Sequence, residues 1–86
     1  MSFTPPPQVP EEFRVLSMMH NIGAISPERS LSAEELAQWT GMDVATVKSY
    51  LQKLHEGGYV EFLQTAGAEK YIVTRIGIMK VLTLYS

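Results

Sequence analysis

Apolar residues recur at helical spacing from Glu11 onward, which predicts a first helix in the chain. Four apolar side chains share one stripe of that helix: Phe13, Leu16, Met19 and Ile22. Two glutamates open the segment, which suits the positive end of a helix dipole. Gly23 is a suitable end signal, and the following "ISPERS" is predicted to be a connector with a turn at Pro27.

A second, shorter helix is predicted from its start signal. Ser32 and Glu35 have the spacing of a capping box, in which each side chain accepts a hydrogen bond from the other residue's backbone N–H. Leu36 and Trp39 are expected to point inward, and Trp39 is interpreted as a packing residue rather than a base-stacking platform. Gly41 suits the left-handed residue that follows a helix.

A third helix is predicted to begin after Asp43, a natural N-cap, and to end near residue 56. One sector of this helix is apolar: Val44, Val47, Leu51 and Leu54. The opposite sector holds small or hydrogen-bonding side chains: Ala45, Thr46, Ser49, Gln52 and Lys53. An ordinary surface helix would alternate Glu and Lys there, so this face indicates a binding role.

The remaining segments predict a β-hairpin and a last helix. The β-rich stretches "YVEFL" and "KYIVT" are joined by "QTAGAE", which we expect to form a flexible tip. Thr74 is a candidate N-cap for "TRIGIMKVLTLYS", a helix that is apolar almost all round. Such a helix must be packed against on more than one side. The domain itself covers one side, and we expect a second subunit to cover another.

Composition narrows the class of protein. The 86 residues suffice for one folded domain at 11–86, preceded by a Pro-rich segment at 1–10 that is expected to be a disordered arm. Without cysteine, disulfides and thiolate metal sites are excluded. Neither a secretory signal nor a membrane-spanning run is recognisable, so a cytoplasmic location is expected. The net charge of −2 is unusual for a nucleic-acid-binding protein.

The order helix, short helix, turn, helix, hairpin, helix resembles a winged helix-turn-helix. The segment "LSAEELAQWTGMDVATVKSYLQKLHEGGYVE" is similar to the helix-turn-helix and first wing strand of small archaeal and bacterial winged-helix transcriptional regulators. "YIVTRIG" is similar to the family's passage from the second wing strand into the last helix. The resemblance covers roughly residues 11–85 and implies a mostly helical α+β fold: a three-helix core, a two-stranded wing and a C-terminal helix.

The same resemblance implies a DNA-binding face, with the helix at about 43–56 in the major groove of double-stranded DNA. Its expected contacts lie on that helix and on the wing: Ala45, Thr46, Lys48, Ser49, Gln52, Lys53, Gln64, Thr65 and Lys70. Gln52 suits bidentate pairing with adenine. A homodimer is expected to form through surplus apolar surface on the first and last helices: Val15, Met18, Ile78, Met79, Val81, Leu82 and Tyr85.

The sequence also bears on two other classes of function. An enzyme is not expected, because the sequence contains no nucleophile motif, phosphate-binding glycine loop or metal-ligand cluster, and no cofactor is implied. A winged-helix module that docks onto another protein stays an alternative, since fold does not determine function. The acidic net charge favours that alternative, and so does a wing tip without a basic residue before Lys70.

Overall fold

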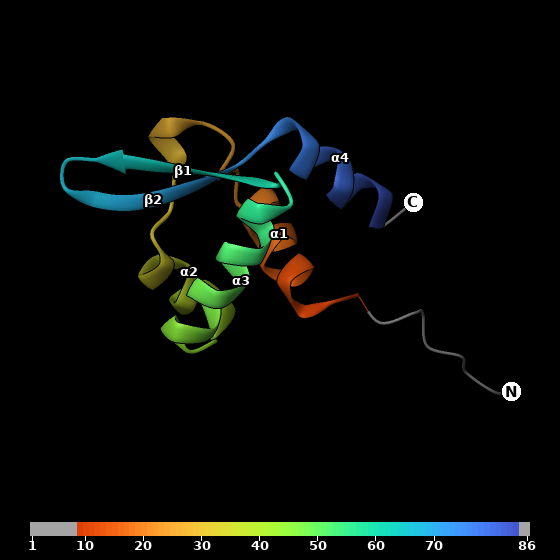
Figure 1. Ribbon diagram of the computed structural model, residues 1–86, viewed down its shortest axis with the longest axis horizontal. Coiled ribbons are helices and arrows are strands. Elements are labelled where there is room, and N and C mark those ends of the chain that lie inside the picture. The colour runs from red at the N-terminus through yellow and green to blue at the C-terminus, as the bar shows by residue number, and fades with distance from the viewer. Residues whose placement is uncertain (1–8, 85–86) are drawn as a thin grey trace, which may run out of the picture.

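The structure, a computed structural model, describes residues 9–84 and contains the predicted elements in the predicted order (Figure 1). These are α1 (Glu11–Asn21), η1 (Pro27–Arg29), α2 (Ala33–Thr40), α3 (Val44–Glu56), β1 (Val60–Thr65), β2 (Ala68–Val73) and α4 (Arg75–Leu84). The mostly helical α+β prediction with a hairpin wing is confirmed. The predicted arm at 1–10 lies outside the described residues except for Val9 and Pro10, and so does Tyr85.

Side-chain caps set the starts of α2 and α3, and a left-handed glycine ends α2. The backbone N–H of Glu35 donates to Ser32 Oγ at 3.1 Å, and the backbone N–H of Ser32 donates to Glu35 Oε1 at 2.9 Å, which completes the capping box. Gly41 adopts the left-handed conformation with φ 74° after α2. Asp43 then accepts from the backbone N–H groups of Ala45 and Thr46. The predicted helix-turn-helix is therefore present.

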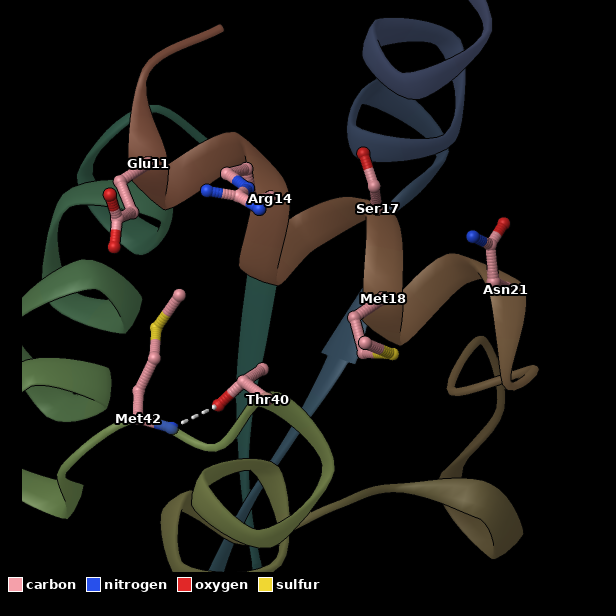
Figure 2. A pocket seen from close by; sticks show the side chains of 7 residues that line it. All are labelled: Glu11, Arg14, Ser17, Met18, Asn21, Thr40 and Met42. Atoms are coloured by element: carbon pink, nitrogen blue, oxygen red, sulfur yellow. Dashed lines mark hydrogen bonds between the residues drawn. The ribbon is translucent and has the colours of Figure 1, made fainter.

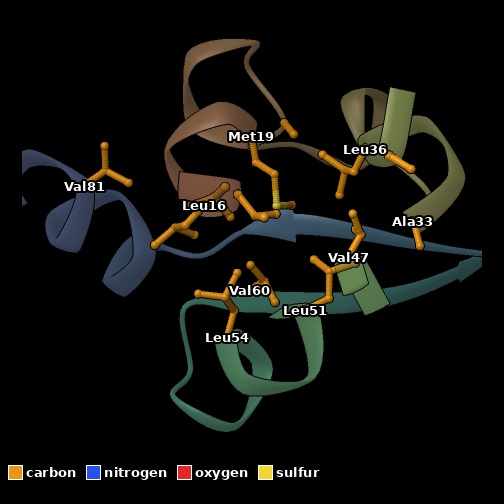
Figure 3. Packing of buried hydrophobic residues seen from close by; sticks show 13 residues of the cluster. Leu16, Met19, Ala33, Leu36, Val47, Leu51, Leu54, Val60 and Val81 are labelled. Atoms are coloured by element: carbon orange, nitrogen blue, oxygen red, sulfur yellow. The ribbon is translucent and has the colours of Figure 1, made fainter. Parts of the chain in front are cut away.

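The core lies where α1 meets α2, α3, α4 and β2, as Figure 3 shows. The largest fully buried side chains come from the first three helices: Val15, Leu16, Met19, Leu36, Val47, Leu51 and Leu54. Val60 and Val73 close the core from the hairpin, and Val81 closes it from α4. The buried stripe on α3 fixes which of its faces is turned to solvent.

Three burial predictions need correction. Trp39 is 57% exposed rather than inward-facing. The buried face of α2 is centred on Ala33, Leu36 and Ala37; at about 100° per residue, Trp39 projects roughly 110° from the centre of that face. Val15 and Val81 are 0% and 3% exposed, so both belong to the core of the protomer and offer no surface to a second subunit.

The hairpin is more regular than the sequence predicted. β1 and β2 pair antiparallel from Val60 with Val73 to Thr65 with Ala68. The strands therefore extend into "QTAGAE", and only Ala66 and Gly67 form the loop. Both have positive φ, 47° and 78°, as in the two-residue turns that match strand twist. Leu31 and Tyr71 add an antiparallel bridge, in which the backbone nitrogen of each residue lies 3.1 and 2.8 Å, respectively, from the carbonyl oxygen of the other.

Thr74 joins the hairpin to α4. Its hydroxyl donates to the carbonyl of Gly58 at 2.6 Å and accepts from the backbone N–H of Gly77 at 3.0 Å, so the predicted N-cap is confirmed. The hairpin projects from one end of the helical core and α4 lies at the other (Figure 1). Among residues 9–84, no helix combines the length and apolar content needed to cross a membrane.

Candidate nucleic-acid interface

The face of α3 opposite its buried stripe carries most of the predicted contacts. Thr46 is half-buried, and five side chains are exposed: Ala45, Lys48, Ser49, Gln52 and Lys53. Short side chains occupy the N-terminal half of this face, so another molecule can approach the helix backbone closely. The structure thus brings the six predicted α3 residues together on one accessible helix, anchored from behind by α1 and α2.

Gln52 is held by its neighbour one helical turn later. Its side-chain Nε2 donates to Glu56 Oε2 at 3.3 Å, and both residues are exposed. The sequence indicated Gln52 as a base contact but did not single out Glu56. The i, i+4 spacing of an amide and a carboxylate was the available signal.

Two cavities border the hairpin, and Tyr71 lines both. The first cavity lies between the start of α2, Lys48 of α3 and β2, and it has a volume of about 220 Å³. Its lining residues are Ser32, Ala33, Glu34, Lys48, Ala68, Glu69 and Tyr71. The cavity near the end of α3, about 300 Å³, is lined by Leu51, Gln52, His55, Phe62 and Tyr71. The rings of Phe62 and Tyr71 pack edge to face at 5.5 Å.

The two cavities differ in charge. The first has two carboxylates, Glu34 and Glu69, against the single ammonium of Lys48, whereas no carboxylate lines the second. Burial raises the pKa of the Tyr71 phenol above its ordinary value of 10.0, and the charges of Glu69 and Glu34 raise it further. Tyr71 therefore stays protonated at neutral pH. An approaching phosphate is repelled at the first cavity more than at the second.

The predicted wing contacts are arranged unevenly. Gln64 and Thr65 are exposed near the hairpin turn. Lys70 instead extends toward α2, where its Nζ lies 3.6 Å from Glu35 Oε1. The backbone N–H of Ser32 lowers the pKa of Glu35, and the charge of Lys70 lowers it further. Glu35 is thus ionised at neutral pH, and it partly neutralises the basic residue expected on the wing.

A third cavity, of about 400 Å³, lies between α1 and the turn that joins α2 to α3 (Figure 2). Met18 and Met42 project into it from opposite sides, and the Thr40 hydroxyl accepts from the backbone N–H of Met42 at 3.2 Å. Met18, predicted at the dimer interface, is half-buried here. No cluster of His, Cys, Asp or Glu suitable for a metal ion occurs in the part of the chain that the structure describes.

The predicted dimer residues of α4 divide into two groups. Met79 and Leu82 are 59% and 58% exposed, whereas Ile78 is half-buried and packs against the core. Ile76 is 58% exposed and lies one turn before Met79, although it was not among the predicted interface residues. Ile76, Met79 and Leu82 form an outward stripe at i, i+3, i+6 spacing, and we call it the α4 stripe.

Comparison with known proteins supports this geometry. The sequence pattern of the family described as the IclR helix-turn-helix domain matches residues 22–64, half of the 86-residue chain. The matched segment runs from the end of α1 through α2 and α3 into β1. It therefore includes the α3 face and the start of the wing. No curated protein matches the chain by sequence.

Three solved structures share the fold at low sequence identity. A MarR family protein from Bacillus stearothermophilus has a TM-score of 0.73 at 15% identity, covering 91% of this chain and 51% of that protein. BpsR from Bordetella bronchiseptica has a TM-score of 0.75 at 17% sequence identity, and the match covers 92% of this chain and 54% of BpsR. The DNA-binding TubR fragment from Clostridium botulinum has a TM-score of 0.73 at 19% sequence identity, and the match covers 98% of this chain and 99% of the fragment. The chain thus spans about half of the first two proteins and nearly the whole TubR fragment.

Proposed function

The chain belongs to the IclR helix-turn-helix domain family, a DNA-binding domain typical of transcriptional regulators, and from this premise we propose its specific activity. It is a sequence-specific regulator that binds double-stranded DNA as a homodimer in the cytoplasm. Helix α3 enters the major groove, and the hairpin lies along the adjacent backbone. The family consists of non-enzymatic regulators, in agreement with the expectation that the chain has no catalytic site.

The observation that carries the proposal is the exposed face of α3. The major groove is wide enough for one α-helix, and base edges are recognised there by hydrogen bonds and by contacts with the thymine methyl group. Ser49 and Gln52 supply the polar groups, while Ala45 and Thr46 supply methyl groups beside them. Lys53 is exposed on the same helix and has no ion-pair partner among residues 9–84, so it is available to a phosphate.

The homodimer is proposed from the α4 stripe. Three large apolar side chains, each nearly 60% exposed, lie on one face of a ten-residue helix. Pairing this face with its copy would cover it on both protomers, since a twofold interface uses the same surface twice. A dimer would also present two α3 helices to an inverted repeat with half-sites about one helical turn apart.

Selection from a random double-stranded DNA library at low salt, followed by sequencing of the retained fragments, tests this function. We expect enrichment of an inverted repeat. Ser49→Glu is expected to abolish binding by placing a carboxylate against the DNA, and Gln52→Ala to relax the sequence preference, both with unchanged circular dichroism. If the folded protein enriches no sequence, or if both variants select the same sites as wild type, the assignment of α3 fails.

A second candidate function is a docking module for another protein. The specific observation in its favour is Trp39, exposed by 57% on the outer side of α2, because aromatic residues are enriched at protein interfaces. Under this alternative the α4 stripe contacts a different protein. A chain that is monomeric when purified and enriches no DNA sequence would favour the docking module over the regulator.

A further inference from the structure

We infer that Glu56 is a positioning residue: it fixes the side-chain amide of Gln52 in the orientation that reads adenine. This inference rests on the proposed function of α3 as the major-groove helix. It concerns a residue that does not itself contact a base.

The geometry begins with the hydrogen bond between the two side chains. Gln52 and Glu56 are one turn apart on the outer side of α3, and Gln52 Nε2 lies 3.3 Å from Glu56 Oε2. An ionised carboxylate only accepts hydrogen bonds, whereas the amide has a donating nitrogen at one end and an accepting oxygen at the other. Glu56 therefore favours the rotamer that turns Nε2 toward it and disfavours the flipped rotamer.

The remaining hydrogen-bonding groups of Gln52 match one base. The nitrogen keeps one N–H that Glu56 does not use, and the carbonyl oxygen keeps its acceptor sites. In the major groove, adenine presents an acceptor at N7 beside a donor at N6, whereas guanine presents two acceptors. The amide N–H and carbonyl oxygen of Gln52 match N7 and N6 of adenine. At guanine, the same carbonyl oxygen would face O6, which is also an acceptor. The site predicted for α3 therefore contains an adenine opposite Gln52.

The same carboxylate has a second, opposite effect on DNA binding. It carries a negative charge on the exposed side of α3, where it repels the phosphates of any duplex. Removing it should raise the affinity for DNA of all sequences and should also release the amide of Gln52. A gain in general affinity together with a loss of discrimination at one base pair is the signature of a positioning residue. A carboxylate without that role would produce the gain alone.

The experiment uses the duplex that the library selection retrieves. The base pair that Gln52→Ala ceases to discriminate is first identified, and a second duplex is made with G·C in place of A·T there. Dissociation constants for both duplexes are measured by fluorescence anisotropy for wild type, Glu56→Ala and Glu61→Ala. Glu61 is the matched control, because it is an exposed carboxylate on β1 rather than on the recognition helix.

We expect wild type and Glu61→Ala to prefer the A·T duplex by about tenfold or more. For Glu56→Ala this preference should fall by roughly a factor of two to three, because the freed amide divides its population between two orientations, while binding to the G·C duplex becomes tighter. Undiminished discrimination in Glu56→Ala, or a discriminated pair other than A·T, would overturn the role of Glu56 and leave the proposed function intact. Absence of DNA binding by folded wild-type protein would overturn the proposed function and this inference with it.

Discussion

Leu82→Ala is expected to dissociate the proposed homodimer while leaving the protomer folded. Leu82 is 58% exposed at the end of the α4 stripe and is not part of the core cluster. Its removal therefore creates no cavity inside the protomer. The buried side of α4, held by Gly77 and Val81, is unchanged.

The size of the effect follows from the exposed fraction. Full burial of a leucine side chain contributes about 1.5–3 kcal/mol. Covering the 58% of Leu82 that is exposed would therefore contribute about 1–2 kcal/mol. A twofold interface contains the substitution twice, so the free energy of dimerisation should weaken by about 2–4 kcal/mol. This corresponds to a roughly 30- to 1000-fold rise in the dimer Kd.

Sedimentation velocity over a wide concentration range would measure that Kd, with circular dichroism as the test of folding. Ile25→Ala is the matched control, because Ile25 is an aliphatic residue exposed to a similar degree, 49%, outside α4. The control should dimerise like wild type. Leu82→Ala should also lose affinity for an inverted repeat while keeping weak binding to a single half-site.

The reasoning would be refuted by either of two results. One is an unchanged dimer Kd in both Leu82→Ala and Met79→Ala, which would show that the α4 stripe is not the interface. The other is equal weakening by Ile25→Ala, which would show that the contact is not confined to the stripe.

Three further predictions concern stability and DNA affinity. Thr74→Val removes two hydrogen bonds to backbone groups, so the free energy of unfolding in urea should fall by about 2 kcal/mol, whereas Thr74→Ser should retain most of it. Glu69→Gln removes a carboxylate from the cavity beside Lys48, so DNA affinity measured by anisotropy at low salt should rise a few-fold for all sequences; an unchanged or lower affinity would place the DNA away from this cavity. Glu35 has a folded-state pKa below 4.5, so its charge stabilises the fold above that pH and the contribution disappears as pH falls through the folded-state pKa. Glu35→Gln should therefore cost at most about 0.5 kcal/mol at pH 7, and that cost should shrink as the pH falls through the folded-state pKa; a cost that grows on acidification would contradict a stabilising charge on Glu35.

Helix ends were predictable from the sequence because they depend on local contacts. The caps at Ser32, Asp43 and Thr74 each bond to a backbone group two or three residues away. Gly41 likewise needs only its own backbone freedom to adopt a φ of 74°. A four-residue window contains the capping bond in each case, so the predicted helix boundaries agree closely with the structure.

Burial was less predictable because it depends on where the neighbouring elements lie. Helix α1 packs against α2, α3, α4 and β2, so these elements of the same protomer bury its wide apolar sector. The sequence pattern showed the width of that sector but not its neighbours, and Val15 was therefore assigned to a dimer interface. Trp39 was misplaced for a similar reason, since the small residues Ala33 and Ala37, rather than the large aromatic residue, share the buried face of α2 with Leu36.

The charge of the cavity beside Lys48 was also beyond sequence reasoning. Glu34 and Glu69 are far apart in the chain and line one cavity only because Leu31 pairs with Tyr71. That bridge holds β2 against the residue that precedes α2. Lys48 was predicted as a phosphate contact from its position on α3 alone, and its acidic surroundings emerge only in the folded chain.

An acidic chain that binds DNA must gain affinity from more than phosphate neutralisation. Lys48 shares its cavity with two carboxylates and Lys70 is paired with Glu35, which leaves Lys53 as the least compensated cation of the three. In the proposed complex each protomer would neutralise roughly one to three phosphates and a dimer about two to six, so the expected slope of log K against log salt is about −2 to −5. Single-protomer binding would be weak, so useful affinity requires two α3 helices on one site. In the proposed complex, the α4 stripe and the base contacts of Gln52 would therefore depend on each other: the stripe would bring a second α3 helix to the site, and Gln52 would supply the discrimination that few charges can provide.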